Sequence, residues 1–282
     1  MSSHDETEPR FKTPPGSCDA HFHVFGPAGR YPYGADLRYK PPHAPLDDFL
    51  GLAGRMGFER YVFVQPSAYG RDNACMLDAM REVGLAKCRG IVDIDENTAH
   101  AEFERLHSAG VRGVRVNVNP IKPPEPGLSK TMISRISGLE TKCSRLGWLL
   151  DFLTPGWLTR ELMPVLAKLK CRYTLAHMGM FLAKDPLPAD FVEFVKRSEN
   201  CWVKLTGVYR ISTAPGFADA APLAQALIAA APDRVIWGSD YPHLSFGHVH
   251  TDALFALLKS WAPQESVRRR ILSDNPARLF SF

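Results

Sequence analysis

Several features are missing from this sequence, and each absence narrows the class of protein. The six cysteines include no CxxC pair, and most of them open or lie within apolar, strand-like runs. This pattern argues against a disulfide framework and predicts buried free thiols in a reducing compartment. The residues concerned are Cys18, Cys88, Cys171 and Cys201.

The chain also lacks long apolar stretches and runs of like charge. No stretch approaches the roughly 20 apolar residues of a membrane-spanning helix, and the polar segment 1–16 has no apolar core typical of a secretory signal. The net charge of +4 is spread along the chain, with no Lys/Arg run that would mark a nucleic-acid interface. We therefore predict a cytoplasmic protein with a flexible tail at residues 1–16 and neither a nucleic-acid nor a membrane partner. A homo-oligomer stays open.

Short β-rich runs alternate with amphipathic stretches along the rest of the chain. A length of 282 residues, 45% of them hydrophobic and 23% charged, is typical of one large globular domain. Strands that alternate with helices indicate a parallel sheet. The expected strands are residues 18–25, 61–65, 89–94, 113–118, 148–152, 172–177, 202–206 and 234–238.

Eight such units predict a closed (β/α)8 TIM barrel over residues 17–282. The alternative is an open, doubly wound sheet. That fold usually has a glycine-rich phosphate turn after its first strand, and this sequence has none there. The closed barrel is therefore the favoured fold.

Polar residues at the carboxyl ends of the expected strands are the candidates for a site, because barrel active sites lie at that end. The first strand carries His21 and His23, which are two residues apart and therefore project to the same side. The sixth strand ends at His177, and Asp240 follows the eighth. If the barrel closes, its first and last strands are neighbours, so we expect these four side chains to converge.

Such a group supports two kinds of chemistry. It can bind a divalent metal ion such as zinc or manganese through imidazole nitrogen and carboxylate oxygen. It can also work without a metal, with Asp240 taking a proton from water while the imidazoles polarise a carbonyl group. The spacing alone does not separate the two.

Arg115 is a further candidate, because an arginine flanked by valines in a strand must be paired or must face a cavity. One interpretation is a buried ion pair with Asp93 or Asp151. The other is a clamp for a substrate carboxylate, which guanidinium binds through two parallel hydrogen bonds. Further polar side chains expected near the same end are Gln65, Ser67, Tyr39, Lys122, Arg210 and His243.

Five segments resemble the amidohydrolase superfamily, and more narrowly its lactonase branch, typified by 2-pyrone-4,6-dicarboxylate lactonase. They are residues 18–27, 64–73, 113–117, 237–243 and 275–280. The resemblance implies a (β/α)8 barrel that hydrolyses small lactones without a tightly bound metal. It also implies that Asp240 activates water while His21, His23 and His177 polarise the lactone carbonyl. Substrate carboxylates would be held by Arg115 and Arg210, with Ser67 and Tyr39 as hydrogen-bond donors.

The chain departs from that branch in three places. Lys122 stands in the loop after the fourth strand where the pyrone lactonase has an arginine, Trp148 stands in place of a substrate-binding tyrosine, and His243 follows Asp240. These departures leave the branch intact and the substrate open. We expect a carboxylated lactone of the pyrone-dicarboxylate, muconolactone or sugar-acid type, from aromatic or sugar-acid catabolism, and no cofactor.

Two other functions remain alternatives. A metal-dependent decarboxylase of an aromatic carboxylic acid would use His21, His23, His177 and Asp240 as ligands to one zinc or manganese ion. A non-catalytic barrel that binds a small acid would keep Arg115, but it would have no need for a carboxylate beside three histidines.

Overall fold

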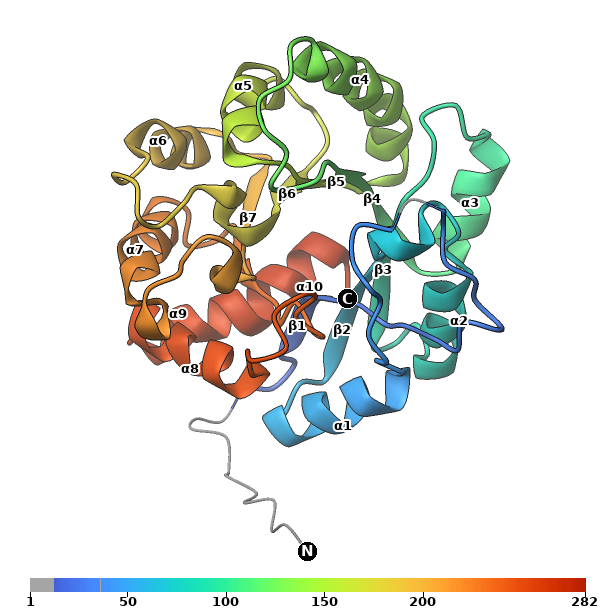
Figure 1. Ribbon diagram of the computed structural model, residues 1–282, viewed down its shortest axis with the longest axis horizontal. Coiled ribbons are helices and arrows are strands. Elements are labelled where there is room, and N and C mark those ends of the chain that lie inside the picture. The colour runs from blue at the N-terminus through green and yellow to red at the C-terminus, as the bar shows by residue number, and fades with distance from the viewer. Residues whose placement is uncertain (1–12, 36) are drawn as a thin grey trace, which may run out of the picture.

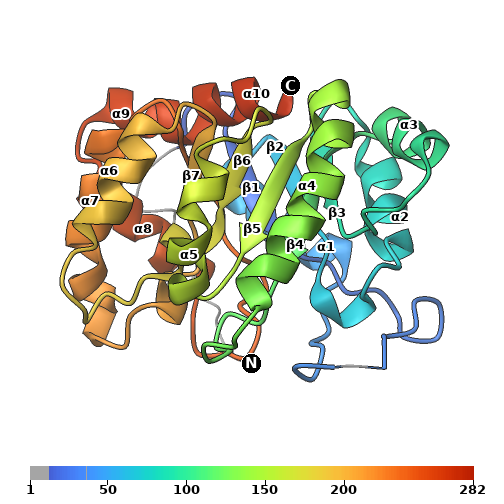
Figure 2. The same cartoon turned by 90° about the horizontal axis from the view of Figure 1, so that it is seen from above.

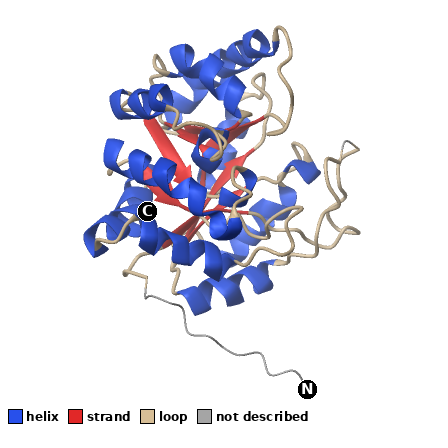
Figure 3. Cartoon of the chain, turned by 60° about the vertical axis from the view of Figure 1, so that its left-hand side comes forward, coloured by secondary structure: helices blue, strands red, loops and turns tan. Residues whose placement is uncertain are grey.

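The computed structural model describes residues 13–35 and 37–282. Eight parallel strands form one sheet in chain order, and Figure 3 shows them enclosed by helices. This confirms the predicted (β/α)8 barrel, and every expected strand is present. The strands are β1 (Cys18–Phe22), β2 (Arg60–Val64), β3 (Cys88–Val92), β4 (Val111–Asn117), β5 (Leu149–Leu153), β6 (Tyr173–Leu175), β7 (Cys201–Leu205) and β8 (Val235–Trp237).

Helices follow the strands and form the outer ring seen in Figure 1. Each longer helix turns an apolar stripe toward the strands, as an amphipathic helix on a core does. A π-helical segment, Arg270–Asp274, joins the last two into an almost continuous stretch. The helices are α1 (Leu46–Met56), α2 (Ala74–Val83), α3 (His100–Ser108), α4 (Leu128–Leu146), α5 (Gly156–Leu166), α6 (Ala189–Arg197), α7 (Ala221–Ala230), α8 (Thr251–Trp261), α9 (Glu265–Arg269) and α10 (Asn275–Phe280).

The barrel closes where the chain leaves β8 and runs beside β1. The backbone N–H of Asp240 donates to the carbonyl oxygen of His21, and the N–H of His23 donates to the carbonyl of Tyr241, both at 2.8 Å. The first and last strands are therefore neighbours, as the placement of the candidate site requires.

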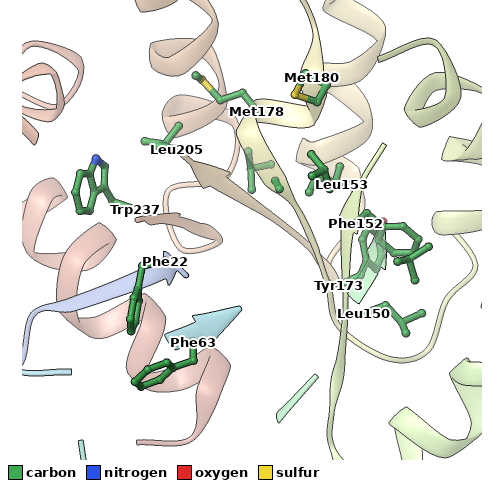
Figure 4. Packing of buried hydrophobic residues seen from close by; sticks show 14 of the residues in the cluster. Phe22, Phe63, Leu150, Phe152, Leu153, Tyr173, Met178, Met180, Leu205 and Trp237 are labelled. Atoms are coloured by element: carbon green, nitrogen blue, oxygen red, sulfur yellow. The ribbon is translucent and has the colours of Figure 1, made fainter. Parts of the chain in front are cut away.

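The apolar core has two layers. Between the strands and the helices, the Phe22 ring stacks on Phe49 of α1 with centroids 3.5 Å apart, and Figure 4 shows Phe22, Phe63 and Trp237 in this packing. Inside the barrel, small and branched strand residues pack against Leu279 and Phe280 of α10. Figure 2 shows α10 at one end of the barrel and the long loops after β1 and β4 at the other. One end is thus plugged, and the carboxyl ends of the strands carry the loops.

The structure also describes the cysteines and part of the N-terminal segment. All six cysteines are buried and free, and no helix in the described part of the chain is long and apolar enough to cross a membrane. Residues 1–12 of the expected tail lie outside the described residues. The remainder is bonded to the barrel, since the Thr13 hydroxyl donates to the carbonyl of Gly57 at 2.7 Å and Ser273 donates to the carbonyl of Pro15 at 2.9 Å.

Candidate active site

A shift in strand register aims the first two histidines into the barrel. Cys18 and Ala20 belong to the inner cluster, whereas Phe22 packs outward against α1. The inward-facing positions therefore change between Ala20 and His21, where the pairing of β1 with β2 is irregular. Bulges of this kind re-aim side chains beside active sites. As a result, His21 and His23 both point inward.

The four residues expected to converge do so. The Oδ1 atom of Asp240 lies 3.5 Å from Nε2 of His21 and 3.4 Å from Nε2 of His23. The other carboxylate oxygen, Oδ2, lies 3.8 Å from Nε2 of His177. No side chain of the four is more than 3% exposed. Two imidazole rings from the first strand segment and one from the end of the sixth thus surround one buried carboxylate.

Two of these residues have unusual backbone conformations. His177 and Asp240 have φ values of 51° and 57°, in the left-handed region that residues other than glycine rarely adopt. Strain of this kind often occurs at functional sites. It also explains why β6 ends at Leu175, two residues before the predicted end of the strand. A Cβ at Gly207 would lie 2.4 Å from Nδ1 of His177, so glycine is required beside this ring.

The second nitrogen of each imidazole has its own partner. Nδ1 of His23 lies 2.8 Å from the carbonyl oxygen of Val64, and Nδ1 of His177 lies 2.8 Å from the hydroxyl of Thr206. Nδ1 of His21 lies 3.1 Å from Nζ of Lys204.

These rings are neutral at ordinary pH. Burial lowers the pKa of all three histidines, in the case of His177 to about 3. A neutral imidazole has one N–H donor and one acceptor nitrogen. The hydrogen-bond partner of each Nδ1 atom therefore determines whether the Nε2 atom of that ring is a donor or an acceptor.

Asp240 is held as a carboxylate. The hydroxyl of Tyr209 donates to its Oδ2 at 2.5 Å, and Nε of Arg210 donates to the same atom at 3.0 Å. Burial opposes ionisation, but the Arg210 guanidinium is the main group that outweighs it, and the pKa of Asp240 is held well below its usual range. Oδ1 has no hydrogen-bond partner among the described residues. The carboxylate therefore has one oxygen that can accept a proton.

A second layer of charge lies beneath the histidines. Nζ of Lys204 lies 2.7 Å from Oδ1 of Asp151, and Nε of Arg115 lies 4.0 Å from the other oxygen of that carboxylate. Arg115 also donates to the carbonyl of Gln65 at 2.5 Å. Of the two ion-pair partners expected for Arg115, the structure places Asp151 beside it. Asp93 instead pairs with Arg135 of α4 at 2.9 Å.

Lys204 is the residue that sequence reasoning missed. It is fully buried and lies between Val203 and Leu205 in β7. That is the same signal, a cation between apolar strand residues, that identified Arg115. The positions of Tyr209 and Thr206 just beyond β7 could likewise have been given a role.

The remaining candidates are distributed around the loops. The hydroxyl of Tyr39 accepts the N–H of Ala68 at 3.3 Å, which places it at the short 3₁₀ turn η1 (Ser67–Tyr69). The Gln65 amide donates to the carbonyl of Asp72 at 2.7 Å and so holds this loop. Further out, Lys122 pairs with Glu125 at 2.5 Å.

His243 and Trp148 face other partners. His243 is bonded through Nε2 to the Thr251 hydroxyl at 2.8 Å, and its ring packs edge-on against Tyr209. Trp148 precedes β5, so it lies at the plugged end of the barrel, where its indole N–H donates to Nδ1 of His107 at 2.9 Å. The expected contact of Trp148 with substrate is therefore corrected. A residue at the start of a strand cannot reach a site at the strand ends.

The cluster has donor atoms of the kind that divalent metals bind. One ligand atom each from His21, His177 and Asp240 lies within 4.8 Å of the others. Two imidazole nitrogens and a carboxylate oxygen form a donor set known for zinc and manganese. The spacing of these atoms fits one ion. The contact between Nζ of Lys204 and Nδ1 of His21 affects whether Nε2 of His21 can bind a metal ion.

Comparison with known proteins places this site in a family. The amidohydrolase family model matches residues 18–282. A 4-sulfomuconolactone hydrolase of Hydrogenophaga intermedia is 37% identical over 279 residues, covering 96% of this chain and 90% of the relative. A 2-pyrone-4,6-dicarboxylate hydrolase of Comamonas testosteroni is 32% identical over 289 residues, covering 97% and 93%.

The fold agrees with a solved relative as well. A crystal structure of an Agrobacterium tumefaciens protein without ligand superposes with a TM-score of 0.85 at 28% identity, covering 97% of this chain and 98% of that one. The match in sequence thus extends over the whole described barrel, including the strand ends that carry the histidines and Asp240. The chain belongs to the amidohydrolase family.

Proposed function

We propose that this protein is a hydrolase that opens small anionic lactones by attack of water on the ring carbonyl. The observation that carries the proposal is the buried carboxylate of Asp240, whose free oxygen faces Nε2 of His21 and of His23 at 3.5 and 3.4 Å. A general base beside donors for a developing oxyanion is the arrangement that acyl transfer to water needs.

The charge balance of the site favours an anionic substrate. The described residues bring three cationic side chains into this region together with two carboxylates whose pKa is lowered. Burial raises the pKa of a third buried carboxyl group, Asp19, to about 7, so it adds less than a full negative charge near neutral pH. A buried cation without a counter-charge is costly, so a carboxylate or sulfonate group on the substrate would balance the excess. The cations are Arg115, Lys204 and Arg210, and the carboxylates are Asp151 and Asp240.

The chemistry then follows from these groups. Water transfers a proton to Asp240 as its oxygen bonds to the lactone carbonyl carbon. The carbonyl oxygen gains negative charge, which imidazole N–H donors stabilise. The ring C–O bond breaks, and the leaving oxygen takes the proton back from Asp240. The open-chain acid then ionises, so each turnover releases one proton.

The names of the relatives support this class of substrate, since both are described as hydrolases of lactones that carry a sulfonate or carboxylate group. A role in aromatic or sugar-acid catabolism is part of the proposal, as are a cytoplasmic location and activity without a metal ion. The metal-dependent decarboxylase remains a second hypothesis. It is tested by measuring carbon dioxide release when the protein is given an aromatic carboxylic acid.

The first test is the substitution Asp240→Asn, assayed by proton release from 4-sulfomuconolactone, 2-pyrone-4,6-dicarboxylate and sugar-acid lactones. We expect kcat to fall about 10²- to 10⁴-fold, because the amide cannot take a proton from water. The thermal unfolding midpoint should show that the fold persists. Product analysis separates ring opening from isomerisation.

Asp93→Asn is the matched control, because Asp93 also follows a strand but is paired with Arg135 rather than with the histidines. It should retain near-wild-type kcat. Undiminished lactone hydrolysis by Asp240→Asn would remove Asp240 from the role of base. Carbon dioxide release from an aromatic acid, with no lactone opened by the wild-type protein, would favour the decarboxylase.

A further inference from the structure

Lys204 is a fully buried cation that the proposed reaction does not use. Its Nζ atom has two polar neighbours, Oδ1 of Asp151 at 2.7 Å and Nδ1 of His21 at 3.1 Å. Asp151 in turn accepts a hydrogen bond from the Thr174 hydroxyl. Lysine is rarely buried without a specific partner, so this contact with a site histidine calls for a functional explanation.

The direction of the hydrogen bond to His21 follows from the donor inventory. Burial lowers the pKa of Lys204, but the Asp151 carboxylate at 2.7 Å opposes this effect and favours the ammonium form. A lysine ammonium has three donors and no acceptor. Lys204 therefore donates to Nδ1 of His21. Because the ring is neutral, its single N–H must be at Nε2, the nitrogen that faces Asp240.

His23 is fixed in the opposite way. Its Nδ1 atom lies 2.8 Å from the backbone carbonyl of Val64, and a carbonyl oxygen only accepts hydrogen bonds. The N–H of His23 is therefore at Nδ1, and its Nε2 carries a lone pair. The two imidazoles thus present a donor and an acceptor to the same oxygen of Asp240.

We propose that Lys204 is a positioning residue that fixes His21 with its proton on Nε2, so that His21 donates to the lactone carbonyl. His23 and Asp240 each accept a hydrogen bond from one O–H of the attacking water, and Asp240 then takes the proton that the water loses. This inference rests on the proposed lactonase function and divides the work among the histidines. In the family resemblance, by contrast, all three polarise the carbonyl.

The same tautomer disagrees with a metal at this point. A nitrogen that carries a proton has no lone pair for a metal ion, so His21 cannot be a ligand through Nε2 while Lys204 donates to Nδ1. The spacing of His21, His177 and Asp240 is compatible with one metal ion. The hydrogen bond from Lys204 is not compatible with it, because it leaves the proton on Nε2 of His21. Removing the Lys204 cation should therefore raise the affinity of the site for a divalent metal ion.

The direct test is two-bond ¹H–¹⁵N correlation spectroscopy of the wild-type protein labelled at histidine, which reports which ring nitrogen carries the proton. The His21 and His23 signals are assigned by their loss in His21→Asn and His23→Asn. We expect the Nε2–H form for His21 and the Nδ1–H form for His23. A His21 ring protonated at Nδ1 would overturn the proposal.

Lys204→Met then tests whether Lys204 is the group that fixes the tautomer of His21. The variant should lose the single tautomer of His21, and its kcat should fall about 10- to 100-fold, the usual effect of removing a group that orients an active-site histidine. KM should stay within a few fold. Zinc affinity, measured by titration of the unliganded variant, should rise above that of the wild type.

Lys142→Met is the matched control, because Lys142 likewise has two hydrogen-bond acceptors, the carbonyls of Glu96 and Thr98, but lies on α4, away from the histidines. It should change neither the tautomer nor kcat. A Lys204→Met protein that keeps the Nε2–H form and full kcat would contradict the role of Lys204. If no lactone is hydrolysed by the wild type, the proposed function fails, yet the spectrum still decides the tautomer.

Discussion

At the scale of single residues, Arg210 controls how easily Asp240 gains a proton. Its Nε lies 3.0 Å from the carboxylate, and this cation is the main group that lowers the pKa of Asp240 against the effect of burial. A lower pKa keeps the base ionised as the solution becomes more acidic. The wild-type kcat/KM should therefore be level through neutral pH and should fall only in strong acid.

Arg210→Met removes this cation and should raise the pKa of Asp240. We expect the acid limb of kcat/KM to move to higher pH, because the carboxylate is then protonated earlier as the pH falls. The measurement is kcat/KM against pH with an anionic lactone. Arg160→Met, which breaks a surface pair with Asp190, is the control and should leave the profile in place. Superimposable acid limbs for wild type and Arg210→Met would show that the ion pair does not set this pKa.

The candidate site could be predicted from the sequence where a residue's place at a strand end was enough. His21, His23, His177 and Asp240 were found in this way, and the structure brings them together. Lys204 was missed because its function depends on contacts across the barrel with Asp151 and His21, and no spacing along the chain encodes those contacts. The error at Trp148 had another cause, since family likeness was given more weight than its position before β5.

At the scale of elements, the approach of β8 to β1 sets the position of His21. A Cβ on Gly238 would lie 2.6 Å from the backbone nitrogen of His21 and 2.7 Å from its Cβ. Contacts this short force a shift, and here the neighbour is backbone rather than a flexible side-chain end. Only glycine lets the two segments meet at the distance that the site needs.

Gly238→Ala should therefore displace His21 from Asp240 and lower kcat by roughly 10²-fold, since about 1 Å of misplacement can have that effect. The control is Gly54→Ala on α1, where an added Cβ meets nothing within 4 Å. That change should leave kcat unaltered and raise stability by up to about 1 kcal/mol. Both are measured by steady-state kinetics and thermal unfolding. A fully active Gly238→Ala enzyme would mean that the contact between the segment after β8 and β1 can accommodate an added Cβ without displacing His21.

The strands and helices themselves were largely evident in the sequence. The sequence predicts helices at about residues 46–56 and at 221–230, and these are the observed bounds of α1 and α7. The irregular parts were not predictable from periodicity. The register shift in β1, the left-handed turn after β6 and the π-helical link before α10 each depend on packing or hydrogen bonds between distant segments.

At the scale of the whole molecule, the two ends of the barrel use cations differently. At the plugged end, arginines before or at the starts of strands donate to backbone carbonyls. Arg89 bonds to the carbonyl of Phe280 at 3.2 Å and Arg172 to that of Gly147 at 2.9 Å. Such bonds satisfy carbonyl groups left open where helices end. At the loop end, Arg115 is buried and Arg210 is partly exposed beside the histidines, where an anionic substrate would balance their charge.

The central claim is that this barrel activates water with Asp240 and neutral imidazoles, without a metal ion. Its most direct test is kcat/KM for an anionic lactone after exhaustive chelation, with the metal content per chain measured on the same sample. We predict that activity is fully retained when less than about one chain in ten carries zinc or manganese. Loss of activity on chelation, restored by adding back one of these ions, would contradict the account.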